Sequence, residues 1–281
     1  MNRGGWSDGA GGMGGVSFPR LTQAVKFLMI VNGAVALLQL IWFMSTGDTF
    51  YQLLGTSLDK FLGNPIYGVL SLFTYQFVHD ARDLWHIFGN LLVLYFFGTM
   101  VESRIGTKAL IWLYLACGVA GGLFWWLFSA LTGQGMVPCV GASGAAFGIL
   151  TYAAFMAPMS LVILILFPVR LWVVAALFGG FALYSTLIAL RLGGGGGDVA
   201  HAAHVGGALL GAWVWWKRDW IRGLGYRLAN AGRERERRRQ RSRAERLDRL
   251  LRKIKEAGMT GLSKAERRFL SRYSKDKRDQ P

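Results

Sequence analysis

The chain has 281 residues, of which 53% are hydrophobic, and it carries a formal net charge of +16. Leu, Ile, Phe and Trp gather in blocks of roughly 18 to 25 residues, about the length that crosses the hydrocarbon core of a bilayer. The two cysteines, Cys117 and Cys139, have neither the number nor the spacing of a disulfide framework or a metal site. We therefore predict an integral membrane protein of the all-α class, for which we expect neither a cofactor nor a metal.

The apolar blocks predict six membrane-spanning helices, which follow a glycine-rich leader over residues 1–20 that we expect to be disordered. The first block is too long for the core of a signal peptide and no small-residue cleavage site follows it, so we interpret it as a retained helix. Residues 45–78 are broken by Gly and Pro and are expected at the outer membrane interface. The six expected spans are Leu21–Met44, Leu84–Val101, Ala109–Leu131, Ala142–Ala157, Val169–Leu190 and Val199–Trp216.

The basic residues predict the orientation of this membrane domain, residues 21–216. Residues 217–281 hold 23 Lys and Arg against 9 Asp and Glu, a net charge of +14 that leaves +2 for the rest of the chain. Short basic segments stay cytoplasmic, and an even number of spans returns the chain to its starting side. We therefore expect a multi-pass protein of the cell membrane with cytoplasmic N- and C-termini.

The basic tail divides into two expected parts. Residues 217–246 form a charge-dense linker. Residues 247–281 form a small cytoplasmic helical hairpin, because Leu247, Leu250 and Ile254 repeat at helical spacing and Ser263 with Glu266 makes a capping box. Anionic lipid headgroups are the partner that we favour for this charge, and nucleic acid is the alternative that we do not expect.

Ser143 and His204 are the candidate catalytic pair. An unpaired polar group is costly inside a bilayer, so ionisable residues there are functional candidates. Ser143 lies in Gly141-Ala142-Ser143-Gly144 at the start of the short fourth span, where free backbone N–H groups and the helix dipole favour an oxyanion. His204 lies among glycines on the sixth span. Together they offer a nucleophile and a general base.

Small residues can bring these two spans together. Gly144 and Gly148 on span four, and Gly207 and Gly211 on span six, give each helix a face over which it can pack closely. His201 shares a face with His204, but His204 lies deeper and beside the glycines, so it is the favoured base. A metal site at His201 and His204 is an alternative, but the pair has no carboxylate or cysteine beside it as a further ligand. A haem held by His86 with His201 or His204 is a weaker alternative.

His86 and Asn90 lie four residues apart on one face of span two. They either join helices by hydrogen bonds or complete an oxyanion hole with the Ser143 backbone N–H, and both interpretations stay open. Asp198 lies off the face of His204, and Glu102 lies about 24 Å along the helix from His86. A Ser–His dyad is therefore favoured over a triad.

These residues together resemble the rhomboid intramembrane serine proteases, over residues 22–216. The resemblance implies a six-helix rhomboid-like bundle, with Ser143 as nucleophile and His204 as base. It also implies His86, Asn90 and the Ser143 backbone as oxyanion donors. His79 matches a histidine with an expected structural role, and Leu70-Ser71 stands where many members have Trp-Arg. The motifs are His86-Ile-Phe-Gly-Asn90, Glu102-Ser-Arg104-Ile-Gly106, Gly141-Ala-Ser143-Gly144 and Ala203-His204-Val-Gly-Gly207.

We therefore predict an intramembrane serine endopeptidase that hydrolyses peptide bonds in or near the transmembrane segments of membrane-anchored proteins, within the lipid bilayer. A catalytically silent rhomboid-like protein that binds or escorts membrane clients is the alternative, and the intact Ser143 and His204 argue against it. A small-solute transporter is a further alternative, but the sequence shows no inverted repeat.

Overall fold

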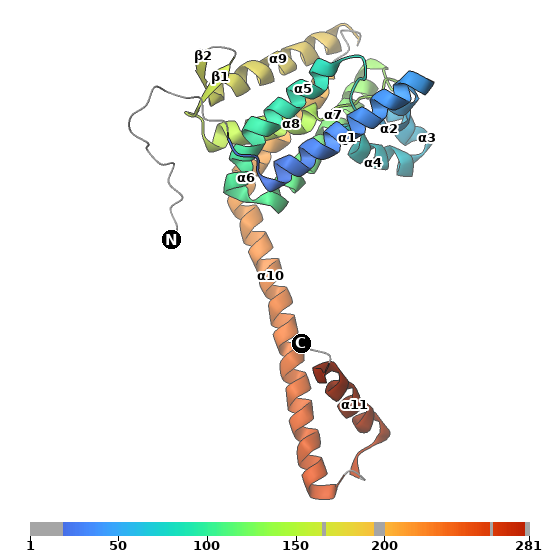
Figure 1. Ribbon diagram of the computed structural model, residues 1–281, viewed down its shortest axis with the longest axis vertical. Coiled ribbons are helices and arrows are strands. Elements are labelled where there is room, and N and C mark those ends of the chain that lie inside the picture. The colour runs from blue at the N-terminus through green and yellow to red at the C-terminus, as the bar shows by residue number, and fades with distance from the viewer. Residues whose placement is uncertain (1–18, 165–166, 194–199, 259–260, 279–281) are drawn as a thin grey trace. The chain divides into compact units, whose positions relative to one another are not determined.

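The computed structural model describes residues 19–164, 167–193, 200–258 and 261–278 (Figure 1). Most of the expected disordered leader, residues 1–18, lies outside these described residues. By its internal contacts the chain divides into two compact units, Met1–Trp216 and Lys217–Pro281. We call them the membrane unit and the tail unit.

The membrane unit is built of helices, as the apolar blocks predict. Four helical stretches of the described chain are long and apolar enough to cross a membrane: Gln23–Ser45, Leu84–Ile105, Thr107–Thr132 and Leu171–Arg191. An all-α membrane bundle is therefore confirmed. The count of six spans stays a prediction, because the apolar helix α8 has 14 residues. The elements are α1 (Gln23–Thr46), α2 (Thr49–Leu54), α3 (Leu58–Gly63), α4 (Pro65–Thr74), η1 (Tyr75–Phe77), α5 (Leu84–Val93), η2 (Leu94–Gly98), α6 (Thr99–Ile105), α7 (Thr107–Thr132), α8 (Ser143–Met156), β1 (Leu161–Leu164), β2 (Phe167–Arg170), α9 (Leu171–Arg191) and α10 (His201–Ala257).

The connection between α8 and α9 departs from an entirely helical structure. Pro158 follows α8 closely, and the residue before a proline disfavours helical backbone, so α8 ends at Met156. Strands β1 and β2 then form an antiparallel hairpin in which Leu161 pairs with Arg170. Half of the eight strand residues are β-branched or aromatic, the types that favour strands: Val162, Ile163, Phe167 and Val169. The fifth expected span begins at Leu171 rather than at Val169.

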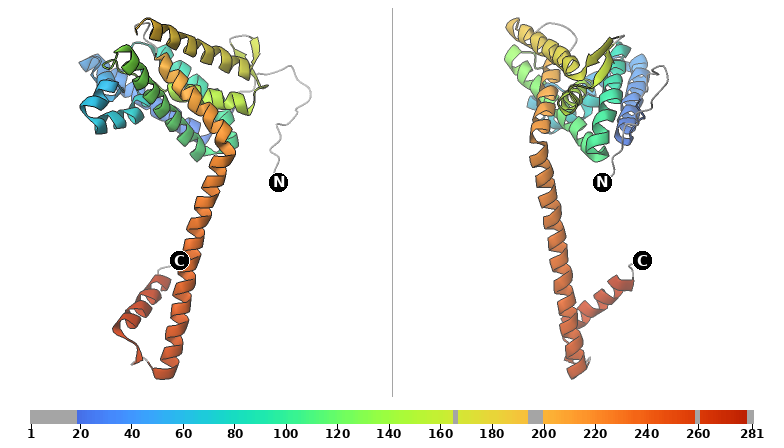
Figure 2. Two further views of the ribbon diagram at one scale, coloured as in Figure 1. Left: turned by 180° about the vertical axis from the view of Figure 1, so that it is seen from behind. Right: turned by 90° about the vertical axis from the view of Figure 1, so that its left-hand side faces the viewer.

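Helix α8 lies among α5, α7, α9 and the start of α10 (Figures 1 and 2). Nine of its 14 residues are buried, including Ala145, Ile149 and Ala153. A helix covered on several sides has little contact with lipid. Its first turn can therefore carry a polar residue without the cost of exposing that residue to hydrocarbon.

Glu102 ties the start of α1 to the corner between α6 and α7. Its side chain is buried and accepts hydrogen bonds from the backbone N–H groups of Ala24 at 2.9 Å and Val25 at 3.0 Å. The hydroxyls of Thr22 and Thr107 also donate to it. The N-terminus of a helix has free N–H groups and attracts negative charge. Glu102 therefore caps α1 from a distant part of the chain.

The tail unit contains the remainder of α10 and α11 (Lys264–Arg278). Residues 217–246, expected as a linker, are helical within α10. The capping box is present, because the Ser263 N–H donates to Glu266 at 2.7 Å and the Glu266 N–H donates to the Ser263 hydroxyl at 3.3 Å. Leu250 and Leu262 are buried, and Lys253 bonds Glu266 across the turn at 3.1 Å. The two helices therefore pair as a hairpin, while the role of these parts as separate domains stays a prediction.

Candidate active site

Ser143 is the first residue of α8, and the loop before it is held in one conformation. Gly141 has a φ of +119°, which L side chains rarely adopt, and a Cβ there would lie 2.6 Å from Nε2 of His86. The Gly141 N–H donates to the carbonyl of Tyr75 at 3.0 Å. Cys139, two residues before Gly141, forms an isolated antiparallel bridge with Thr56. The first turn of α8 therefore starts from a fixed backbone.

His204 lies within hydrogen-bond distance of this serine. Its Nε2 is 2.8 Å from Ser143 Oγ, and the residue as a whole is 7% exposed. Nδ1 of His204 is buried, and no side chain or backbone group of the described residues bonds to it. The structure thus brings together the two residues that the sequence paired. No acidic third member bonds to the histidine within the described residues, which leave out Asp198.

Phe147 is a site residue that the sequence reasoning missed. Its ring stacks on His204, with the two ring centroids 4.2 Å apart and the planes 7° from parallel. Phe147 lies four residues after Ser143, so it projects from the same face of α8 one turn further along. This spacing was the available signal. The stacked ring limits how the imidazole of His204 can turn.

Glycines on α8 and α10 face each other as the sequence predicts. A Cβ on Gly207 would overlap the backbone of Gly144, and a Cβ on Gly211 would overlap that of Gly148. A Cβ on Gly148 would in turn lie 2.9 Å from the carbonyl oxygen of Gly207. The two helices are therefore in direct backbone contact beside the Ser143–His204 pair.

His86 and Asn90 lie on α5, next to the start of α8. Nε2 of His86 faces Gly141, and a Cβ added to that glycine would also lie 3.6 Å from Ser143 Oγ. Asn90 is 8% exposed, and its Nδ2 has no hydrogen-bond partner in the part of the chain that the structure describes. An amide donor that is buried and free is unusual in a folded protein. His86 therefore lies beside the start of α8, and Asn90 carries a free amide donor one turn further along the same helix.

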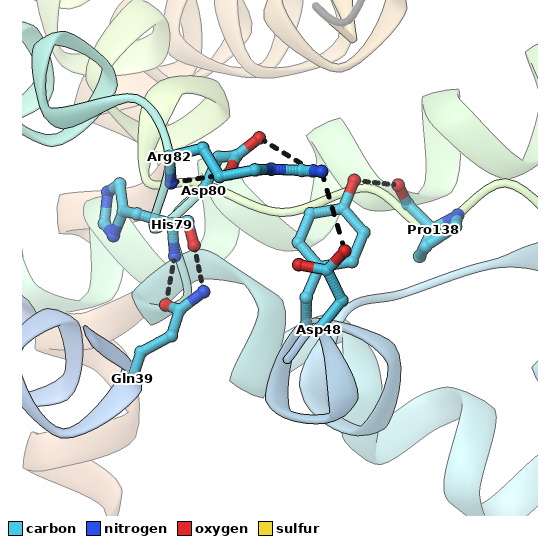
Figure 3. A network of polar contacts seen from close by, with 7 residues as sticks. Gln39, Asp48, His79, Asp80, Arg82 and Pro138 are labelled. Atoms are coloured by element: carbon cyan, nitrogen blue, oxygen red, sulfur yellow. Dashed lines mark hydrogen bonds and ion pairs between the residues drawn. The ribbon is translucent and has the colours of Figure 1, made fainter. Parts of the chain in front are cut away.

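Polar contacts on one side of the site join the loop before α5 to the segments around it (Figure 3). The amide of Gln39 accepts from the His79 N–H at 3.0 Å and donates to the His79 carbonyl (Figure 3). Burial lowers the pKa of His79 to about 3, so this ring stays neutral. The main chain of His79 is thus fixed to α1, in keeping with the structural role expected for this histidine.

Arg82 extends this network to Asp48, which directly precedes α2, and Tyr51 on α2 joins the loop before α8. Its guanidinium lies 3.0 Å from Asp80 and 3.6 Å from Asp48. Burial raises the pKa of Asp80, but the hydrogen bonds and charge of Arg82 outweigh it and hold that pKa below its usual value. On α2, the Tyr51 hydroxyl donates to the Pro138 carbonyl at 3.1 Å, and burial raises the pKa of Tyr51 to about 12. The chain before Ser143 is therefore anchored to α2 as well as to Thr56.

Leu70 and Ser71 occupy the two positions where Trp-Arg is common. The first lies at the surface and the second in the interior. Leu70 is 57% exposed, while Ser71 is buried and donates to the Thr56 hydroxyl at 2.8 Å. The same hydroxyl accepts from the Trp126 indole at 3.0 Å. A buried hydroxyl cluster therefore fixes α4 to α7 at this position.

The bundle and the Ser143–His204 pair define a helical membrane protein with a serine–histidine site. A model of the Rhomboid domain matches residues 67–218, which is more than half of the chain. The chain therefore belongs to the rhomboid family. In the tail unit, residues 234–276 match a family of unknown function, DUF6576.

Three relatives place the chain within this family. It is 32% identical over 136 residues to Rhomboid protein 1, mitochondrial, of Saccharomyces cerevisiae, covering 48% of this chain and 38% of the relative. It is 33% identical over 173 residues to RHOMBOID-like protein 12, mitochondrial, of Arabidopsis thaliana, covering 57% and 48%. It is 32% identical over 145 residues to Presenilin-associated rhomboid-like protein A, mitochondrial, of Danio rerio, covering 48% and 36%. The chain thus spans less than half the length of each of these relatives.

The names of these relatives correct one expectation. The predicted location in the cell membrane with cytoplasmic termini is wrong, because the relatives are named as mitochondrial proteins. The physical reason is that charge bias separates the two sides of a membrane. It carries no information about which membrane is crossed.

We predict that Gly211→Ala lowers the reactivity of Ser143, although Gly211 contacts neither Ser143 nor His204. The added methyl overlaps the Gly148 backbone, so α8 and α10 must separate, and a displacement near 1 Å costs about 100-fold in rate. The measurement is the rate at which a fluorophosphonate probe labels Ser143 in detergent. Gly223→Ala is the matched control, because Gly223 lies on the same helix with nothing within 4 Å of its added Cβ. Equal labelling of both variants would contradict the prediction.

Proposed function

We propose that this rhomboid is an intramembrane serine endopeptidase that cleaves membrane-anchored proteins in or near their transmembrane segments. The observation that carries the proposal is the 2.8 Å separation of Ser143 Oγ and His204 Nε2 inside a membrane bundle. A serine hydroxyl is a weak nucleophile until an adjacent base takes its proton. Few other roles require this pair at hydrogen-bond distance in a site of low polarity.

The reaction follows from the roles of these atoms. The Ser143 hydroxyl attacks the scissile carbonyl carbon and gives its proton to Nε2 of His204, forming a tetrahedral intermediate with a negative oxygen. His204 then returns the proton to the leaving amine as the C–N bond breaks, which leaves an acyl-enzyme. Water, deprotonated by the same imidazole, attacks the ester and releases the second product and the free Ser143. His204 thus acts as general base and then as general acid in each half-reaction.

The negative oxygen needs donors that are in place before it forms. Three groups at the start of α8 and on α5 meet this need: the Ser143 backbone N–H, the His86 ring and the free Nδ2 of Asn90. Preorganised donors in a site of low polarity stabilise developing charge strongly and need no reorientation. The free amide of Asn90 favours this role over a structural hydrogen bond.

A substrate must reach Ser143 in an extended form. The peptide bonds of a helix are shielded by their own hydrogen bonds, so a transmembrane substrate has to unwind locally before attack. Gly141 lies beside Ser143, where even an added Cβ would come within 2.6 Å of Nε2 of His86, so the space next to the serine is narrow. We therefore propose small residues at the cleaved bond, which a panel of test substrates that vary at this position would check.

We predict that Ser143→Ala and His204→Ala each abolish both probe labelling and cleavage. Loss of the nucleophile or the base removes general-base catalysis, which is worth roughly 10²- to 10⁴-fold in rate. The measurement is the cleavage of a transmembrane test substrate by the full chain in proteoliposomes. Ser129→Ala, which alters another buried serine on α7, is the control and should keep the wild-type rate.

The same assay decides between this proposal and the catalytically silent alternative. The proposed endopeptidase activity would be overturned if the wild-type protein bound the test substrate but cleaved it no faster than Ser143→Ala does. Such a result would support a protein that binds or escorts membrane clients.

We predict that Asn90→Ala lowers the turnover number by about 10²-fold and changes KM little. Removal of one oxyanion donor typically costs this much, because the bond forms in the transition state and not with bound substrate. The measurement is the separate determination of kcat and KM on the transmembrane substrate. Gly89→Ala on the same helix, which adds a methyl into open space, serves as control. An increase in KM with unchanged kcat would instead assign Asn90 to substrate binding.

We further propose that the basic tail binds anionic lipid headgroups. Arg239 and Arg243 are exposed and one helical turn apart on α10, and like charges at this spacing destabilise a helix unless anions lie nearby. Each basic residue near an anionic membrane contributes about 1 kcal/mol.

For the full chain in vesicles, we predict that phosphatidylglycerol protects the tail from chymotrypsin and that phosphatidylcholine alone does not. Chymotrypsin cleaves after leucine and aromatic residues, which the substitutions below leave unchanged. Replacement of four exposed arginines by glutamine should remove the protection: Arg238, Arg239, Arg241 and Arg243. Four such replacements by lysine keep the charge and should retain it. Protection that is equal in both lipids would contradict the proposal, and protection by added RNA alone would point to nucleic acid.

A further inference from the structure

His201 is a histidine of the site for which the mechanism above has no role. It is the first residue of α10 and lies one turn before His204. The ring centroids of the two histidines are 5.6 Å apart and their planes are 83° from parallel. Rings at 4.5–7 Å that meet edge to face attract each other beyond their hydrophobic contact. The His201 ring thus packs against the ring of the proposed base.

On its other side, the His201 ring meets α9. Its centroid lies 5.3 Å from that of Phe181, and the two planes are perpendicular. His201 therefore fills the space between His204 and α9, while Phe147 covers His204 from α8. Three aromatic rings from three helices contribute to this arrangement around the base. A change in any of them alters the room in which the imidazole can turn.

The base needs such support because its hydrogen bonds do not fix it. In serine proteases a carboxylate commonly accepts from the second imidazole nitrogen and sets the orientation of the ring. Here Nδ1 of His204 has no partner among the described residues, and only Nε2 lies against Ser143. A ring bonded at one nitrogen can still tilt about that bond. Its orientation must therefore come from packing.

We propose that His201 is a positioning residue that, together with Phe147, holds the His204 imidazole in the orientation that receives the Ser143 proton. This rests on the proposed protease function. Nδ1 of His201 is itself buried and unbonded in the described chain, so the two histidines touch through their rings and not through a hydrogen bond. The aromatic ring, and not its nitrogen atoms, is the feature that matters.

The test compares His201→Ala with His201→Phe in the full chain. A fluorophosphonate probe is titrated at fixed time points, which separates the maximal labelling rate of Ser143 from the probe concentration at half-saturation. We expect His201→Ala to lower the maximal rate between about 10- and 100-fold, as for a misplaced catalytic group, with half-saturation unchanged. His201→Phe keeps a ring and should stay within about threefold of the wild type. Tyr184→Ala on α9, 64% exposed, is the control for loss of an aromatic and should label at the wild-type rate.

Thermal unfolding of each variant separates positioning from general stability. Should His201→Ala fail to fold, His201→Leu replaces it, since leucine keeps volume but has no ring. Labelling of the ringless variant at the wild-type maximal rate would overturn the proposal, as would labelling of His201→Phe that is as slow as the ringless variant. The proposed function fails by a different result, namely wild-type protein labelled no faster than Ser143→Ala.

Discussion

The backbone contact between α8 and α10 is the constraint on which the site depends. Lipid is as apolar as a leucine side chain, so helices in a membrane gain little from burying large apolar residues against each other. They gain from close approach, which the paired glycines Gly144–Gly207 and Gly148–Gly211 permit. Ser143 precedes the first of these glycines and His204 lies three residues before its partner, so the 2.8 Å contact is set by the separation of the two backbones.

Buried polar groups in the described chain differ in how fully they are hydrogen-bonded. Glu102 accepts four hydrogen bonds and so stabilises the start of α1 at little desolvation cost. In contrast, Asn90 Nδ2 and His204 Nδ1 are buried without partners among the described residues. Each free group costs folding free energy. Such a cost is expected in a catalytic site, because groups that are free in the empty site can form hydrogen bonds with the transition state.

The sequence predicted those parts of the site that depend on spacing along one helix. The facing glycines of α8 and α10 and the approach of His204 to Ser143 follow from helical periodicity, while the depth of both residues in the membrane stays a prediction. The Thr56–Cys139 bridge and the ring contacts of Phe147 and His201 did not, because they join segments whose approach only the tertiary structure determines. The β1–β2 hairpin was missed for another reason: its apolar run after Pro158 fits a buried strand or a helix equally well.

The charge pattern predicts that the two faces of the membrane domain differ, although it does not identify the membrane. The basic tail follows Trp216, and Trp213, Trp216 and Trp220 are exposed, which is typical of tryptophans at a membrane interface. Arg104 lies at the end of span two and Arg170 follows span four. If α8 crosses the membrane, both arginines lie on the same side as the basic tail, because the chain changes side with each span. Ser143 begins α8 at the opposite end from Arg170, so the proposed protease would take its substrates from the side that the basic residues avoid. This sidedness depends on the sign of the charge alone and is therefore independent of which membrane holds the protein.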